Sequence, residues 1–315
     1  MLKVEGLTKH YNHHAVVDDL SFHCDAGEVL GFLGPNGAGK STTMKMITGF
    51  VSPSAGTASI CGHDIVADGL AAKQRLGYLP EGAPCYSEMT TASFLSFIAE
   101  IRGLNSVKDS LRLDELIERL HLGPVLNQTI ETLSKGFKRR VGLAQAILHD
   151  PDVLILDEPT DGLDPNQKHE VRELIRSMSA EKLIVISTHI LEEVEAVCSR
   201  AIIIAQGKIL ADDSTEKLAQ KSPYHNAVLI NVVAGGNLEQ VQADLGKLDS
   251  VEKTEVDLER STITVLSNTE SNDDMDAWRD VTDLVNAGAV SIEGLELKSG
   301  RLEDYFRHIT QGTLA

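Results

Sequence analysis

No long apolar run occurs in this sequence. The longest uninterrupted runs, such as VLIL at residues 153–156, are far shorter than the ~20 residues that a membrane-spanning helix requires. We therefore expect that the chain does not cross a bilayer. The opening residues, MLKVEGLTKHYN, contain no cationic segment followed by an apolar one, so we also expect no secretion signal.

Cysteine and positive charge are also scarce. The four cysteines, Cys24, Cys61, Cys85 and Cys198, show no CxxC spacing, which favours reduced thiols in a cytoplasmic compartment, most of them as buried filler. There are 29 Lys and Arg residues against 47 Asp and Glu, a net charge of -18, with no long basic block. General nucleic-acid binding is therefore disfavoured.

What remains is the composition of an ordinary globular protein, with 42% hydrophobic and 24% charged residues. A chain of 315 residues exceeds one comfortable core, so its length favours a large domain followed by a smaller one.

The first two thirds alternate strand-like and helical segments, which predicts a parallel sheet with helices on its faces. EVLGFLG, VLILD and LIVIS have the continuous apolar character of strands covered on both faces, at residues 28–34, 153–157 and 183–187. KVEGL and GTASI alternate instead, which indicates an antiparallel edge sheet. Between residues 85 and 133 the pattern is helical, with no convincing strand.

A second unit follows a predicted linker at residues 220–226, where Ser222-Pro223 breaks the helical periodicity. From Ala227 the expected order is strand, helix, strand, strand, helix, strand, and then a last helix. That order is typical of a split βαβ, ferredoxin-like unit. Residues 220–315 hold 17 acidic and 8 basic residues, so this part is not a nucleic-acid arm.

GPNGAGKS, at Gly34–Ser41, matches the phosphate-binding pattern GxxxxGK[ST] between a predicted strand and a predicted helix. Backbone N–H groups and the positive helix end can converge there on a phosphate. Gly37 and Gly39 permit the turn, Lys40 can reach the terminal phosphates, and Ser41 can coordinate Mg²⁺. An ordinary glycine-rich turn would explain the glycines but not the Lys-Ser pair.

Two carboxylates end the strand VLILD. Asp157 would hold the Mg²⁺ shell, and Glu158 would orient or deprotonate an attacking water, because carboxyl ends of such strands face the ligand crevice. The alternative is that these acids only cap the next helix. His189 follows another apolar strand and could reach the γ-phosphate side, or it could be a solvated strand-end histidine.

LSKGFKRRVGLAQ, at residues 133–145, concentrates Lys135, Lys138, Arg139 and Arg140 in an acidic chain. Ser134 can cap the following helix and Gly136 allows close approach, so N–H groups and Lys135 could face an anion. A small polyanion explains this cationic cluster. The alternative is a capped surface helix with solvated charges.

With this stretch, the sequence resembles the nucleotide-binding subunits of ABC transporters over about Leu2–Lys217. The family's signature motif is usually LSGGQ; LSKGF keeps Leu133, Ser134 and Gly136 but differs at Lys135 and Phe137. By that resemblance DGLD at residues 161–164 is the D-loop and His189 the H-loop switch. Tyr11 would stack on adenine with Val16 beside it, unless Tyr11 is an ordinary surface tyrosine.

The resemblance implies ATP and Mg²⁺ as cofactors, with Glu158, His189 and Lys40 in catalysis and Ser41, Glu81 and Asp157 at the metal. Glu81 stands where the family usually has a glutamine. This glutamate and SKGF…RVGLAQA resemble a subgroup serving separate-chain drug, gliding-motility and metal or cofactor-assembly exporters. The implied nucleotide contacts are Tyr11, Val16, Gly34, Pro35, Asn36, Gly37, Ala38, Gly39, Lys40, Ser41, Thr42, Glu81, Ser134, Lys135 and Gly136.

The expected fold is therefore an α/β P-loop NTPase of the ABC ATPase type at residues 1–219, with a helical insertion at about 85–150. After the linker, residues 227–315 would form an accessory α+β, ferredoxin-like domain. The implied function is ATP binding and hydrolysis by a head-to-tail dimer of identical or equivalent chains. The dimer would drive a separate integral-membrane permease, in the direction of export, from the cytoplasmic face of the cell membrane.

Three alternatives belong to other classes. A soluble ABC-type ATPase acting on ribosomes or DNA usually carries two cassettes or a long coiled-coil insertion, and neither is present. A P-loop kinase or GTPase would show motifs such as NKxD, which the sequence lacks. A regulatory nucleotide-binding module without turnover would be separated by a phosphate-release assay. HYNHH, at residues 10–14, has poor spacing for a tetrahedral metal site.

Overall fold

The computed structural model describes residues 1–82, 85–233, 237–268, 275–288, 290 and 292–311. The chain forms two compact units, Met1–Thr215 and Glu216–Ala315. None of the helices in these ranges combines the length and the apolar character needed to cross a bilayer.

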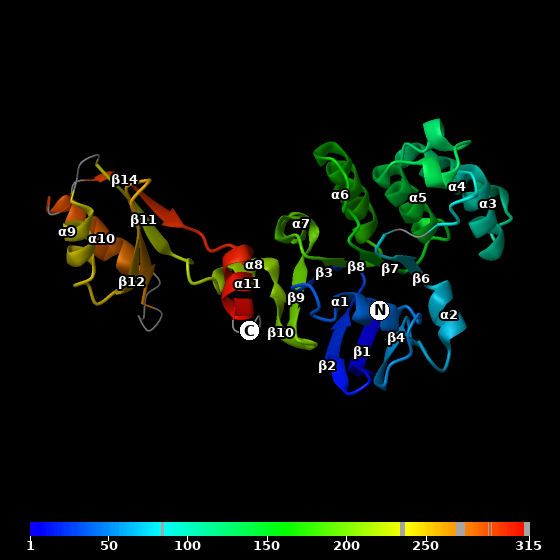
Figure 1. Cartoon of the computed structure of the whole chain (residues 1–315), viewed down its shortest axis with the longest axis horizontal. Coiled ribbons are helices and arrows are strands. Elements are labelled where there is room, and N and C mark those ends of the chain that lie inside the picture. Colours follow the sequence, from blue (N-terminus) through cyan, green and yellow to red (C-terminus); the bar gives the residue numbers. More distant parts are fainter. Residues whose placement is uncertain (83–84, 234–236, 269–274, 289, 291, 312–315) are drawn as a thin grey trace. The chain divides into compact units, whose positions relative to one another are not determined.

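A six-stranded sheet forms the centre of the first unit (Figure 1). Five strands are parallel, and β10 pairs antiparallel with β9 at one edge. Every residue of β3, β7 and β8 is buried, as continuous apolar runs predict for strands covered on both faces. The order is β10 (Lys208–Ser214), β9 (Arg200–Ala205), β3 (Val29–Leu33), β8 (Leu183–Thr188), β7 (Val153–Asp157) and β6 (Leu76–Leu79).

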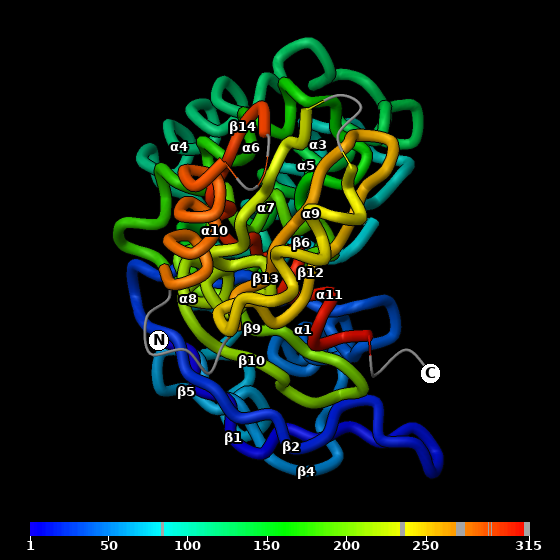
Figure 2. Tube along the Cα trace, turned by 90° about the vertical axis from the view of Figure 1, so that its left-hand side faces the viewer, coloured from blue at the N-terminus to red at the C-terminus, as the bar shows by residue number. Residues whose placement is uncertain are grey.

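The expected antiparallel edge sheet is a second sheet in the same unit, and Figures 1 and 2 show its strands gathered together. Exposed and buried residues alternate at the start of its strand β1, so one face packs on the core. The apolar cluster beneath it joins these strands to α1 and the parallel sheet. The order is β2 (His14–Cys24), β1 (Leu2–Tyr11), β4 (Ala55–Ile60) and β5 (His63–Asp64).

Helices lie on both sides of the parallel sheet, with α5, α6 and α7 on one side and α1 on the other (Figure 1). The stretch expected to be helical, residues 85–133, holds α3, α4 and two short 3₁₀ turns, with an isolated Thr90–Thr129 bridge. The helices of this unit are α1 (Lys40–Ile47), α2 (Gly69–Gln74), α3 (Thr91–Ile101), α4 (Val107–Arg119), η1 (Gly123–Val125), η2 (Ile130–Thr132), α5 (Lys135–Ile147), α6 (Pro165–Ser179) and α7 (Leu191–Val197). A further helix, α8 (Thr215–Gln220), starts at the last residue of this unit and belongs otherwise to the second unit.

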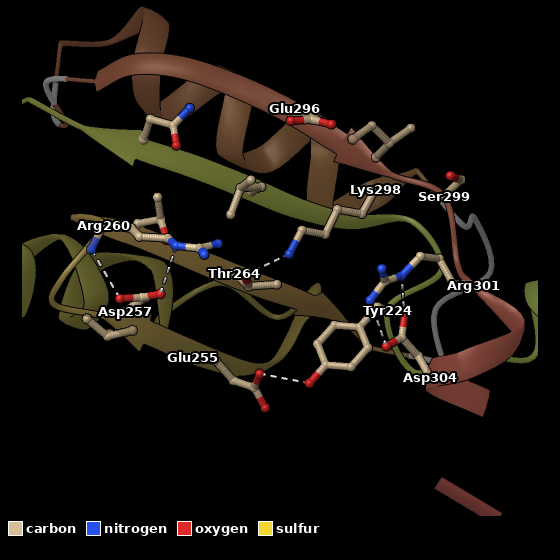
Figure 3. A pocket seen from close by; sticks show the side chains of 15 residues that line it. Tyr224, Glu255, Asp257, Arg260, Thr264, Glu296, Lys298, Ser299, Arg301 and Asp304 are labelled. Carbon is tan, nitrogen blue, oxygen red and sulfur yellow. Dashed lines mark hydrogen bonds and ion pairs between the residues drawn. The ribbon is translucent and has the colours of Figure 1, made fainter. Parts of the chain in front are cut away.

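The second unit has the element order predicted for a ferredoxin-like fold. Its four strands are all antiparallel, and apolar residues of α9 and α10 pack on one face of the sheet. The other face is polar and borders a cavity of about 1000 Å³ lined by Tyr224, Glu255 and Lys298, among others (Figure 3). The elements are β11 (Ala227–Val232), α9 (Leu238–Leu245), β12 (Val251–Asp257), β13 (Thr262–Ser267), α10 (Asp276–Asn286), β14 (Ile292–Lys298) and α11 (Leu302–Thr310), with strand order β12-β13-β11-β14.

The expectation that most cysteines are buried filler holds for two of the four. None of the four forms a disulfide within the described residues; Cys24 and Cys198 are buried, whereas Cys61 and Cys85 are half-buried. Burial raises the pKa of the Cys24 thiol to about 12, so this side chain stays protonated and packs as a small apolar group.

Candidate functional site

The glycine-rich turn lies between β3 and α1, as the pattern predicted. Gly39, the residue before α1, has φ 104°, a conformation that L side chains rarely adopt. A Cβ on Gly34 would lie 2.4 Å from the Ile204 carbonyl oxygen, and one on Gly39 would lie 2.7 Å from that of Val16. These two glycines are therefore required by close backbone approach, which brings the turn against β9 and β2.

Lys40 begins α1 and is 8% exposed. Its ammonium donates to the carbonyl oxygens of Gly34 at 2.7 Å and Pro35 at 3.2 Å, so the side chain folds back over the turn. Burial lowers the pKa of Lys40. Three carboxylates oppose that shift, in order of effect Glu158, Asp157 and Glu81. The turn and the strand-end acids therefore form one electrostatic site.

Asp157 ends β7 and is 1% exposed. Within the described residues neither of its carboxylate oxygens has a hydrogen-bond partner in good geometry. Burial raises its pKa, while the nearby hydroxyls of Ser187 and Ser41 lower it in part. A buried carboxylate with unsatisfied oxygens beside a serine hydroxyl is a donor set that fits a hard divalent cation such as Mg²⁺.

Glu81 follows β6 and is exposed. Its charge raises the pKa of Asp157 as well as that of Lys40, so it lies within electrostatic reach of the same site. The position at which the resemblance implied a glutamine therefore adds negative charge to the surroundings of the strand-end acids.

Glu158 has φ 52°, an uncommon conformation for a residue other than glycine. The surroundings hold it there, because its N–H donates to the Ser187 carbonyl at 2.8 Å and Arg139 donates to its own carbonyl oxygen. Its side chain is 15% exposed. Oε1 lies 2.8 Å from Nδ1 of His189, and Oε2 accepts from the Thr188 hydroxyl at 3.2 Å. Both carboxylate oxygens are thus engaged by protein groups.

His189 stands immediately after β8 with its side chain 55% exposed. The structure therefore brings Lys40, Asp157, Glu158 and His189 to the carboxyl edge of the parallel sheet, where ligands bind in α/β folds.

Most basic residues of α5 make contacts within the fold, although their clustering suggested that they bind an anion. Arg139 is 4% exposed and donates to the carbonyl oxygens of Pro80 at 3.1 Å and Asp157 at 3.0 Å, besides that of Glu158. Burial is the main influence on Arg139 and lowers its pKa, and the nearby carboxylates of Asp161, Asp157, Glu158 and Glu81 oppose that shift. Arg139 therefore supports the backbone that carries the carboxylates of Asp157 and Glu158.

Two of the other three cations in this stretch also have partners within the fold. Arg140 is buried, pairs with Glu170 at 2.8 Å and lies over the ring of Phe137. Lys138 donates to the Glu131 carbonyl at 2.9 Å. Of the four cations, Lys135 alone is exposed. The polyanion interpretation can therefore apply to Lys135 and the helix start, not to the whole cluster.

Ser134 caps α5 as predicted, since its hydroxyl accepts from the N–H of Phe137 at 3.3 Å. Gly136 is buried, and a Cβ there would lie 2.6 Å from Oε1 of Gln167 at the start of α6. In the described part of the chain no hydrogen bond or ion pair joins Ser134–Gly136 to Gly34–Thr42. The two predicted anion-binding segments therefore have different neighbours.

Tyr11 and Val16 lie on β1 and β2. Tyr11 is 48% exposed, with the Lys9 ammonium 5.3 Å from the centre of its ring. Val16 is half-buried, and its carbonyl faces the close approach at Gly39. The remaining residues of the turn differ in exposure: Asn36 is exposed, Pro35 and Thr42 are half-buried, and Ala38 is buried.

Sequence reasoning missed Thr160, Thr188 and Glu193 as parts of the site, and it assigned Arg139 to an anion-binding cluster rather than to the support of the strand end. Thr188 lies between the carboxylates of Glu158 and Glu193, and Thr160 donates to Glu193. No local sequence pattern marked Arg139 as buried, because its partners are backbone carbonyls 18 and more residues away.

A strand-to-helix glycine turn with a folded-back lysine, facing a buried strand-end aspartate, defines the chain as a P-loop nucleoside triphosphatase. Comparisons with known proteins identify the family. The family model described as "ABC transporter" matches residues 17–161. The Nod factor export ATP-binding protein I of Burkholderia pseudomallei (strain 1710b) is 40% identical over 217 residues, which is 69% of this chain and 71% of that protein.

Two solved structures have the same fold. A structure described as the ATP binding subunit of an ABC transporter is 32% identical, with a TM-score of 0.66, and covers 70% of this chain and 92% of its own. A dimeric ATP-binding cassette in a post-hydrolysis state, bound to ADP and Pi, is 21% identical with a TM-score of 0.63, over 68% of this chain and 98% of its own. The chain belongs to the ATP-binding proteins of ABC transporters and is an ATPase of that family.

Proposed function

We propose that two copies of this chain close head to tail on two ATP molecules and thereby drive a separate integral-membrane permease. The observation that carries the proposal is that the Lys40 turn and the Ser134–Gly136 helix start are both suited to phosphate but share no hydrogen bond or ion pair within the described residues. A second copy would supply the missing face. The dimer named for the ADP-bound neighbour structure supports this arrangement.

In the closed dimer, the turn at Gly34–Ser41 binds the phosphates through backbone N–H groups, and Lys40 leaves its carbonyl partners for the terminal phosphates. Tyr11 offers an exposed ring to the adenine. The Ser134 hydroxyl and the N–H groups at the start of the partner's α5 would complete the γ-phosphate shell.

Glu158 would act as general base. The oxygen of a water molecule bonds to the γ-phosphorus, the bond from that phosphorus to the β,γ-bridging oxygen breaks, and the carboxylate takes the water's proton, which leaves ADP and phosphate. Ser41, Asp157 and Glu81 would hold Mg²⁺, which neutralises charge on the phosphate oxygens. His189 would leave Oε1 of Glu158 and contact the γ-phosphate.

An apolar groove supports docking of a permease on the first unit. It consists of two cavities of about 590 and 650 Å³ that share Phe50, Tyr78, Ile98, Arg102 and Gln145. Large apolar side chains stand exposed along it, with exposed fractions of 71% for Phe50, 76% for Leu70 and 64% for Ile101. A contiguous apolar groove of this kind is typical of an interaction site, and a cytoplasmic helix of the permease would fill it. The chain would then lie on the cytoplasmic face of the membrane.

Export is the direction we propose, because the similar protein from Burkholderia pseudomallei is named for Nod factor export. We assign residues 1–219, with an insertion at about 85–150, to the ATPase domain, and residues 227–315, after a linker at 220–226, to an accessory domain. That accessory domain would regulate the dimer, support dimerisation or contact the permease.

The test of the dimer is the variant Glu158→Gln, which keeps the size of the side chain but cannot take the proton. With Mg²⁺ and ATP it should elute as a dimer in size-exclusion chromatography with light scattering, and it should release little phosphate. Glu192→Gln, the same change at an exposed residue of α7, is the matched control and should behave as the wild type. Phosphate release by Glu158→Gln at the wild-type rate would refute the role of Glu158.

Lys40→Ala tests the phosphate turn separately. Because it removes the ammonium that faces the phosphates, it should lose most ATP affinity in a fluorescent-nucleotide titration. Unchanged affinity, in a variant whose thermal unfolding matches that of the wild type, would contradict the proposed cradle.

A further inference from the structure

A buried carboxylate lies behind the proposed base. Glu193 is in α7, is 4% exposed and is one of the buried charged residues of the first unit. Burying a carboxylate is costly unless donors surround it. Three donors do so: the Thr160 hydroxyl, the Lys168 ammonium at 3.5 Å and the Thr188 hydroxyl at 3.4 Å.

The two oxygens of Glu193 have different partners. Thr160 and Lys168 both lie at Oε1, whereas Thr188 lies at Oε2. The Oε1 contacts therefore orient the carboxylate so that Oε2 is presented to Thr188. Thr160 stands just before residues 161–164, the segment that resembles the D-loop, so this orientation is tied to that loop.

The hydroxyl of Thr188 stands between two carboxylates, 3.2 Å from Oε2 of Glu158 and 3.4 Å from Oε2 of Glu193. It accepts from the N–H of Ile190 at 3.1 Å, which occupies one of its lone pairs. A hydroxyl has one proton, so it can donate to only one of the two carboxylates at a time. Thr188 is thus a donor with two alternative acceptors.

This competition matters because Thr188 remains at Oε2 of Glu158 when His189 leaves Oε1 for the γ-phosphate. A hydroxyl that donates to a carboxylate stabilises its negative charge, so the carboxylate accepts the proton of the attacking water less readily. We propose that Glu193 is a positioning residue that draws the Thr188 hydroxyl away from Glu158 and so leaves Glu158 the better proton acceptor for the attacking water. The inference rests on the proposed role of Glu158 as base.

Glu193→Gln tests the proposal with little change of volume. Thr160 and Lys168 are both donors and would keep the amide oxygen at the Oε1 position, so the amide NH₂ would face Thr188. The hydroxyl could then donate only to Glu158. We expect kcat for ATP hydrolysis to fall about tenfold, as for one hydrogen bond to a charged group, with KM for ATP within twofold of the wild type. Glu192→Gln is the exposed control on the same helix and should change neither.

A double-mutant cycle separates positioning from a structural role. In a Thr188→Val background there is no hydroxyl to redirect, so adding Glu193→Gln should no longer lower kcat; in a Thr188→Ser background the loss should persist. Equal losses in the Thr188→Val and wild-type backgrounds would overturn the proposal. If Glu193→Gln fails to fold, Thr188→Val alone remains decisive. Its kcat should be at least that of the wild type, and a tenfold loss would overturn the proposal.

Glu158→Gln, measured in parallel, distinguishes this inference from the proposed function. If Glu158→Gln abolishes turnover and Glu193→Gln leaves kcat unchanged, the base stands and the positioning role is overturned. If Glu158→Gln retains the wild-type kcat, the proposed base fails and the positioning role fails with it.

Discussion

Acid should destabilise the first unit through one side chain, His149. Its Nε2 lies 2.9 Å from the Leu76 carbonyl oxygen, and its buried Nδ1 is among the side-chain atoms without a partner in the described residues. The imidazole is therefore neutral, with the proton on Nε2. Burial lowers its pKa from 6.5 to about 4, and the positive charges of Arg102 and Lys182 add to the shift, against Asp150 and the carbonyl contact.

The sign of the effect follows from which state binds more protons. Above pH 6.5 both states are neutral at this residue, so it contributes no pH dependence. Between pH 6.5 and about 4 the unfolded chain takes up a proton that the folded chain refuses, so the free energy of unfolding falls with falling pH. Below about pH 4 the loss is complete at roughly 3 kcal/mol, and at pH 5 it is about 2 kcal/mol.

The assay compares urea unfolding of the wild type and His149→Gln at pH 7.5 and 5.0, followed by circular dichroism. Glutamine can still donate to the Leu76 carbonyl but does not titrate. The wild type should therefore lose about 2 kcal/mol more than the variant on acidification. The single tryptophan, Trp278, lies in α10 of the second unit, so its fluorescence follows a transition that His149 should leave unchanged.

Equal acid-induced losses for the wild type and His149→Gln, within about 0.5 kcal/mol, would refute the reasoning, because the difference between the two isolates this one residue. A shared loss would then belong to other titrating groups.

Three further changes test the site and the groove. Arg139→Leu should lower the free energy of unfolding by about 3 kcal/mol, since it leaves three carbonyl contacts unmade. Thermal unfolding of Arg139→Leu, compared with that of Arg139→Lys, measures this loss. Gly34→Ala should weaken ATP binding at least about tenfold in a nucleotide titration, because its Cβ overlaps a backbone carbonyl, whereas Gly69→Ala, in open space, should not. Ile101→Asp should abolish co-purification with membranes at unchanged basal hydrolysis, and Val107→Asp, also exposed but outside the groove, should not; retained co-purification of Ile101→Asp would contradict docking there.

The fold and the nucleotide turn could be predicted because their signals are local. The continuous apolar runs of β3, β7 and β8 indicate strands buried on both faces, and the glycine-lysine-serine pattern needs only the strand before it and the helix after it. The ferredoxin-like order of the second unit could likewise be predicted, because its apolar residues recur with the period of 2 typical of strands or of 3.6 typical of helices.

The strands of the first unit that sequence reasoning did not single out are β2, β5, β6, β9 and β10. β5 and β6 are short, and β2 and β10 lie at sheet edges. The place of β9 beside β3, and of β6 beside β7, depends on pairing across many residues, as between Leu30 and Arg200. Propensity carries little information about such long-range partners.

The amino-acid sequence by itself determined the order of the elements, the turn that suits a triphosphate, and the two carboxylates at the end of a strand. Tertiary structure decided which charges of residues 133–145 stay available, and it placed Glu193 and Thr188 behind Glu158. The reason is that side-chain burial and hydrogen-bond competition depend on groups brought together from distant segments, and no local pattern specifies those neighbours.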